Sequence, residues 1–248
     1  MISSTLIEAI HIAPNVMPNI ISSAPATFAT AAALSTQYAV WGKYYSLNLA
    51  GNQHPMRSHL ELFSHDLSVE HATAATPDAV AVMMNPGGSQ PLATMSLVNG
   101  YAPAKPDTTQ YQLMRIMQRV GWQHVRVLNL SDFRAPKSAD FVRFLAQHPQ
   151  DMRHSIFSET RAVELAASLG NTQGVILGWG VAPAFEPLAR LVLAALPASI
   201  HRFGLKGEVN KPKTDWIYKH PLPLAQPAGQ RAWVETVAAQ IQCLDSAY

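Results

Sequence analysis

The stretch AVAVMMNPGG at residues 79–88 decides the fold of this chain. Its first six residues are apolar without interruption, and the string NPGG that follows favours a turn. Two largely apolar runs come later, VRVLNL at 125–130 and GVILGW at 174–179. Continuous runs of this length are typical of parallel strands that helices cover on both faces. The three runs therefore predict three strands of one buried sheet.

Amphipathic segments separate these runs. Asp107 is suited to cap a helix whose apolar residues recur at helical spacing until Gly121. Shorter predicted elements complete the pattern, namely helices near residues 138–147, 158–169, 183–196 and 229–244 and a strand near 200–205. The alternation of strands and helices predicts an α/β protein, a three-layer sandwich with a central and mainly parallel sheet.

The chain before this pattern has a different character. From Lys43 the segments KYYSLNL and HLELF alternate apolar and polar residues, which predicts two antiparallel strands around a turn at 51–58. Residues 23–39 contain good helix formers, but the residues before them resemble a loop. We expect an N-terminal accessory extension over residues 1–42 and a single α/β domain over residues 43–248.

The composition limits the classes of function. With 48% hydrophobic and 14% charged residues, disorder driven by charge is excluded. The net charge of +2 gives no general attraction to nucleic acid or anionic lipid. Cys243 is the single cysteine and no Lys or Arg precedes Lys43, so neither an intrachain disulfide nor a signal peptide is expected. No apolar run is long enough to span a membrane. We expect a cytoplasmic protein with no membrane partner.

Small and polar residues follow the predicted strands, where an open parallel sheet binds its ligands. The candidate catalytic residues are Asn85 and His220, and the candidate ligand-binding residues are Pro86, Gly87, Gly88, Asn129, Trp179, Lys213 and Lys219. Structural interpretations exist for the same residues: NPGG as an ordinary turn, Asn129 as a loop cap, Trp179 as a packing residue and His220 as a surface or core side chain. The order of these loops along the chain favours the functional interpretation.

Four strings between residues 77 and 224 resemble an uncharacterised bacterial and phage family that is known only as a domain of unknown function. The strings are MMNPGG, VRVLNLSDFRAP, VILGWG and KHPLPL. The family has approximately MLNPS, VVNLFALRATDP, WG and HPLYL at the corresponding places. Its name implies no activity.

A weaker similarity extends to the uracil-DNA glycosylase superfamily. MMNPGG is similar to the GINPG loop of its mismatch-specific branch, VLNL to a strand that ends in Asn, and KHPLP to the HPSP loop. This similarity implies an α/β fold and hydrolysis of an N-glycosidic bond, with Asn85 positioning water, His220 donating to a base oxygen and Asn129 reading a base edge. As a loop amide, Asn85 is expected to contribute little to stability.

Two departures from that superfamily favour a rival interpretation. No Asp or Glu lies in the Asn85 loop, so the general base of the uracil branch is absent, and Leu222 replaces the Ser of HPSP. The rival interpretation is a non-catalytic binding module in place of a hydrolase. In either case the expected partner is a nucleobase, a nucleotide or a nucleic acid.

Competing sites match known patterns less well. Residues 54–71 contain four histidines with Glu61, Asp66 and Glu70, but their spacing matches no zinc motif, and a solvated strand face is expected instead. Neither GxSxG nor GxxxxGK[ST] occurs, and we expect no metal and no cofactor. A polyanion would bind where cations outnumber acidic residues, at Arg202, Lys206, Lys211, Lys213 and Lys219.

Overall fold

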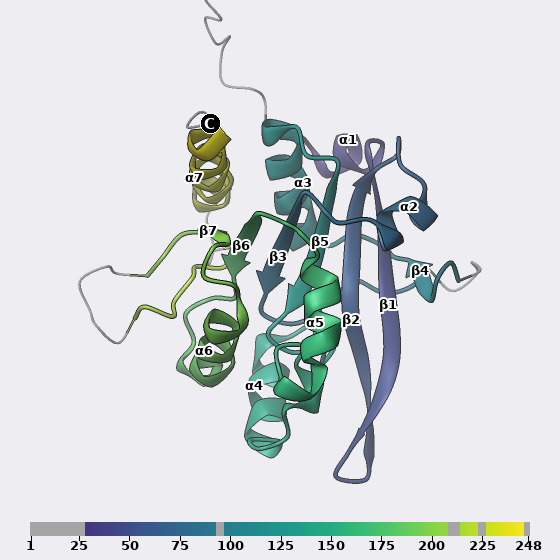
Figure 1. Ribbon diagram of the computed structural model, residues 1–248, viewed down its shortest axis with the longest axis vertical. Coiled ribbons are helices and arrows are strands. Elements are labelled where there is room, and N and C mark those ends of the chain that lie inside the picture. Colours follow the sequence, from purple (N-terminus) through teal and green to yellow (C-terminus); the bar gives the residue numbers. More distant parts are fainter. Residues whose placement is uncertain (1–27, 93–96, 208–213, 223–226, 246–248) are drawn as a thin grey trace, which may run out of the picture.

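The computed structural model describes residues 28–92, 97–207, 214–222 and 227–245, which form a single mixed sheet with helices around it (Figure 1). The strands are β1 Tyr38–Leu49, β2 Asn52–Ser64, β3 Ala79–Met83, β4 Tyr101–Pro103, β5 His124–Asn129, β6 Gly174–Gly178 and β7 His201–Phe203. The α-helices are α1 Ala31–Ser35, α2 Val69–Ala74, α3 Thr108–Val120, α4 Ser138–Gln147, α5 Ala162–Leu169, α6 Glu186–Ala195 and α7 Pro227–Asp245. Short 3-10 turns lie at Met152–His154, Glu159–Arg161 and Pro183–Phe185.

The sheet has a parallel half and an antiparallel half. Its strand order is β4-β1-β2-β5-β3-β6-β7. The neighbours β5, β3, β6 and β7 pair in parallel, whereas β4, β1, β2 and β5 pair antiparallel. The three apolar runs become β3, β5 and β6, which confirms the α/β class. The sheet is mixed rather than mainly parallel, because the long β1–β2 hairpin joins it along β5.

Helices lie on both faces of the sheet (Figure 1). On β3, Val80 and Val82 pack into one cluster with side chains of α4, α5 and α6. Ala79, Ala81 and Met83 point the other way and pack with α3 and α7. Every residue of β3 is buried, as an uninterrupted apolar run requires. Among the described residues, no helix has the length and apolar character to cross a membrane.

The β1–β2 hairpin is longer than the sequence predicts. β1 begins at Tyr38 rather than Lys43, and the chain reverses at Ala50 and Gly51, whose φ angles are 49° and 83°. Two adjacent residues with positive φ make the tight turn that suits the twist of a hairpin. The predicted pair of antiparallel strands is confirmed, but the predicted extent of the turn, 51–58, is wrong, since residues 52–58 belong to β2. Within residues 23–39, where the sequence has good helix formers, residues 31–35 form α1, and residues 1–27 lie outside the described part.

One extra residue in β2 changes which side chains share a face. Lys43 pairs with His59 and Tyr44 pairs with Arg57, so Ser58 has no partner across the hairpin. Such a β-bulge interrupts the alternation of side chains between the two faces of the sheet. As a result Arg57 lies on the same face as Leu60, which packs with the α3 and α7 cluster.

A buried polar network joins β2 to β5 where the two halves of the sheet meet. The Glu61 carboxylate is fully buried and accepts hydrogen bonds from Arg126 Nε at 2.8 Å and His124 Nε2 at 2.7 Å. Tyr101 Oη donates to it at 3.2 Å. Burial by itself would raise the pKa of Glu61, but the bonds from His124 and Arg126 outweigh burial and lower it. The predicted solvated strand face is therefore wrong, and no group able to hold a metal ion occurs among the described residues.

Removing Glu61 should destabilise the fold strongly. Glu61→Ala leaves the Arg126 guanidinium buried without its carboxylate, and we expect a loss of about 3–5 kcal/mol in the free energy of unfolding. Glu235→Ala is the matched control, because it breaks only surface pairs, with Arg119 and Arg231, and should cost less than about 1 kcal/mol. Urea denaturation measures both. Equal losses would show that the buried network contributes no more than a surface pair.

Candidate functional site

A cavity of about 240 Å³ lies at the carboxyl ends of β3 and β5. Its polar wall comes from five segments, namely β2 with Arg57, the loop after β3 with Asn85, Gly87 and Gly88, the start of α3 with Asp107, the end of β5 with Asn129, and the segment after β7 with His220. Because parallel strands end at the same edge of a sheet, β3 and β5 bring their following residues together. The structure thus unites Asn85, Gly87, Gly88, Asn129 and His220 in one cavity.

Other predicted site residues do not line this cavity. Trp179 is fully buried in the cluster with α4, α5 and α6, and its Nε1 donates to the Trp216 carbonyl at 2.9 Å. The Pro86 carbonyl accepts hydrogen bonds from Asn85 Nδ2 and from the Ala135 backbone N–H. The Lys219 side chain is exposed and lies outside the cavity lining. Trp179 therefore acts in packing.

Only part of the predicted basic cluster can be placed. Arg202 is exposed and donates to the carbonyl groups of Leu193 and Leu196 at the end of α6. Lys206 precedes a segment that is not described. Lys211 and Lys213 lie outside the described residues, so the polyanion prediction stays a prediction.

Asn85 fastens the loop that follows β3. Its Nδ2 donates to the carbonyl groups of Pro86, Phe133 and Ala135 at 3.0, 3.2 and 2.9 Å. These bonds tie the loop after β3 to the loop after β5 and fix the direction of the side chain. These bonds argue against the expectation that Asn85 contributes little to stability, because its loss would remove a donor from the carbonyl groups of Phe133 and Ala135. Asn85 Oδ1 is buried and accepts no hydrogen bond from the described residues.

Buried polar atoms without partners gather at this cavity. Asn129 is 1% exposed, and both its Oδ1 and Nδ2 lack partners. Arg57 is 2% exposed, and its Nε and Nη1 lack partners as well. Of twelve such side-chain atoms in the described part of the chain, five belong to Arg57, Asn85 and Asn129. Unpaired buried polar groups are rare because each costs free energy, so their concentration makes this cavity the candidate ligand site.

His220 presents a hydrogen-bond donor at the same site. Its Nδ1 accepts a hydrogen bond from the Leu222 backbone N–H at 3.2 Å. Burial lowers the pKa of His220, against the opposing effect of the Asp107 charge. The ring is therefore neutral near pH 7, and because Nδ1 accepts, Nε2 carries the proton.

Asp107 brings a carboxylate for which the sequence allows a helix cap or a ligand contact, with the cap preferred. Its Oδ1 does cap α3, accepting from the backbone N–H groups of Thr109 and Gln110 at 2.9 and 3.1 Å. Its Oδ2 lies 3.2 Å from the position that a Cβ atom on Gly87 would occupy. The missing side chain at Gly87 thus lets the carboxylate approach the Asn85 loop. Among the described residues nothing donates to this Oδ2.

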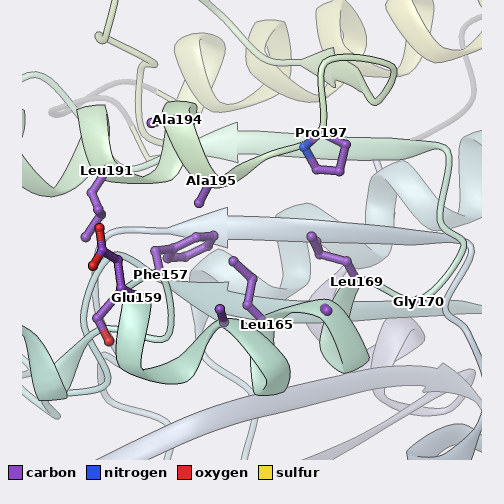
Figure 2. Close-up of a pocket in the computed structure, with 12 residues that line it drawn as sticks. Phe157, Glu159, Leu165, Leu169, Gly170, Leu191, Ala194, Ala195 and Pro197 are labelled. Carbon is purple, nitrogen blue, oxygen red and sulfur yellow. The ribbon is translucent and has the colours of Figure 1, made fainter.

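A larger cavity of about 500 Å³ lies between α5 and α6. Figure 2 shows Phe157, Leu165, Leu169 and Leu191 along its wall, with Glu159 at one end. This wall is mainly apolar and supplies few directed hydrogen bonds. The smaller cavity at the strand ends is therefore the better candidate, because its unpaired groups can orient a ligand.

Comparison of this chain with protein-family models, with curated proteins and with solved structures finds no match.

A second buried carboxylate, Asp132, lies beyond the end of β5 and outside the cavity lining. Its Oδ2 accepts from Tyr45 Oη at 2.7 Å and from Arg161 Nη1 at 2.6 Å, while Oδ1 has no partner. Burial raises the pKa of Asp132 to about 6, although the Arg161 charge acts in the opposite direction. The folded protein therefore binds a proton at Asp132 that the unfolded chain releases near pH 4.

This raised pKa predicts a pH-dependent loss of stability. Because the folded state holds the proton more tightly, the contribution of Asp132 falls as the pH rises from about 4 to about 6, by about 3 kcal/mol in total. The buried His59 and His154, whose pKa values burial lowers to about 4, give a slope of opposite sign. The measurement is therefore the difference in unfolding free energy between wild type and Asp132→Asn.

Between pH 4 and pH 6 the unfolding free energy of the wild type should fall relative to that of Asp132→Asn. Asp151→Asn is the control, because a hydrogen bond from Arg153 lowers the pKa of Asp151 to about 2 and its effect falls below pH 4. A constant difference between wild type and Asp132→Asn across pH 4–6 would contradict the raised pKa.

Proposed function

We propose that the cavity at the ends of β3 and β5 binds a nucleobase-containing ligand. The observation that carries the proposal is the buried amide of Asn129, whose donor and acceptor both lack partners. An amide offers a donor and an acceptor side by side, which complements the edge of a purine or pyrimidine. His220 Nε2–H and Asn85 Oδ1 add a second donor and a second acceptor on the same cavity.

The similarity to the uracil-DNA glycosylase superfamily supports this proposal. The NPGG loop, the strand that ends in Asn129 and the His-Pro turn all contribute to one cavity. Helices on both faces of the sheet fit the three-layer sandwich of that superfamily. A cytoplasmic location, where nucleotides are abundant, is part of the same proposal.

Asn129→Asp tests the base-binding role. The substitution keeps the size of the side chain but replaces its donor with a second acceptor, so we expect base affinity to fall about 5- to 100-fold. Asn171→Asp on the exposed surface is the control. Thermal shift and calorimetry with bases, nucleosides, nucleotides and short single-stranded DNA measure the effect. If none of these raises the melting temperature of the wild type, the proposed function is wrong.

The second candidate function is hydrolysis of an N-glycosidic bond, and the position of Asp107 favours it. Asp107 Oδ2 supplies the general base that the Asn85 loop lacks. In the proposed step the water proton passes to Oδ2, the water oxygen bonds to C1′, and the electron pair of the C1′–N bond leaves with the base. The His220 Nε2–H and the Asn129 Nδ2–H stabilise the departing base anion, which then takes up a proton from solvent.

Asp107→Asn removes the proposed general base but keeps the helix cap. Asparagine caps helices as well as aspartate does, so the free energy of unfolding and the ligand affinity should change little. Release of free base should fall about 10²- to 10⁴-fold, the contribution of a general base. Chromatography of the released base measures the rate. A wild type that binds ligands but releases no base would leave a non-catalytic binding module. An undiminished rate in the variant would remove Asp107 as the general base.

A further inference from the structure

Arg57 stands apart from the other deeply buried arginine of the sheet. Arg126 forms an ion pair with Glu61 and also donates to the carbonyl groups of Ser168 and Ala75. Arg57 is as deeply buried, yet among the described residues it forms no ion pair and its Nε and Nη1 bond to nothing. Burial lowers the pKa of Arg57, but a guanidinium keeps its charge in proteins.

An unpaired buried cation destabilises a fold, because the cation loses its hydration and gains no ion pair in exchange. The cost is recovered when an anion binds. We propose, as an extension of the proposed function, that Arg57 forms an anion subsite of this cavity and binds the terminal phosphate of a nucleoside monophosphate.

The surroundings of Arg57 favour an anion. Its partner across the hairpin is Tyr44, and the Arg134 guanidinium lies 5.0 Å from the centre of the Tyr44 ring. Tyr44 Oη and Arg134 Nε are also buried and unpaired. Two cations and a hydroxyl donor thus gather in one region. Two carboxylate charges also act on Arg57, those of Asp107 and Asp132. Asp107 lines the cavity with one oxygen held by the α3 cap, whereas Asp132 lies outside the lining and is paired with Arg161.

The depth of Arg57 argues for a terminal phosphate rather than a backbone phosphate. A phosphodiester within a strand carries a nucleoside on each side, so it needs an open groove along its whole length. Arg57 is 2% exposed and lines a cavity of about 240 Å³. A phosphate monoester is attached on one side only and can therefore reach a guanidinium at this depth, where paired N–H donors suit its oxygens.

The experiment compares a nucleoside, its 5′-monophosphate and inorganic phosphate by calorimetry. For the wild type we expect the monophosphate to bind about 10- to 100-fold more tightly than the nucleoside, the strength of charge-assisted hydrogen bonds. Arg57→Gln should abolish this difference and leave the affinity for the nucleoside within about twofold. Arg143→Gln, at an exposed arginine of α4, is the matched control and should change neither affinity.

The stability of the free variant separates binding from a structural role. Because Arg57→Gln removes an unpaired buried charge, its melting temperature without ligand should equal or exceed that of the wild type. A large fall would overturn the proposal and assign Arg57 to the fold. Arg57→Lys keeps the charge but loses the planar fork, so it should retain only part of the preference for the monophosphate.

The other outcomes distinguish this subsite from the base pocket. Equal wild-type affinity for nucleoside and monophosphate overturns the anion subsite and leaves base binding intact. Binding of phosphate and monophosphate without any binding of nucleosides supports the subsite and overturns the base pocket. Binding of single-stranded DNA that depends on Arg57, without binding of the monophosphate, overturns the terminal-phosphate assignment. Absence of all binding overturns both.

Discussion

The ion pair between Glu61 and Arg126 is the constraint on which the rest of the sheet depends. The two residues lie directly opposite each other on β2 and β5, where the antiparallel hairpin meets the parallel strands. A slip of one residue would turn every side chain of β2 to the other face. It would also leave two charges buried without partners. A buried pair adds little net stability over an apolar pair, but it penalises each wrong register heavily.

This register determines what the cavity contains. With Glu61 opposite Arg126, Leu60 lies opposite Val127, and Asn129 follows two residues later on the same face of β5. The bulge at Ser58 then returns Arg57 to the face of Leu60. Without that extra residue, strand alternation would direct Arg57 to the face of Glu61. A guanidinium and an amide thus reach one cavity because a bulge follows a fixed register.

The sequence predicted the parts of this arrangement that depend on local pattern. The apolar runs located β3, β5 and β6, and the common edge of parallel strands brought Asn85 and Asn129 together as expected. Arg57 was missed as a site residue, and Asp107 was assigned to the helix cap rather than to a ligand, because both come from segments whose neighbours are set only by tertiary packing. No local pattern shows that Ser58 is a bulge. Trp179 was misassigned because a tryptophan between glycines has the same local sequence in a core as in a site.

Arg57 and Asp107 line the same cavity without neutralising each other. Arg57 is influenced by the charge of Asp107, yet its Nε and Nη1 bond to nothing. The α3 cap holds one oxygen of Asp107, since Thr109 and Gln110 donate to Oδ1, while Oδ2 lies beside Gly87. A direct ion pair would satisfy both groups and close the space between them. Since no ion pair joins the two groups, the proposed function assigns Arg57 to the charged part of the ligand and Asp107 Oδ2 to the proton of the reacting water.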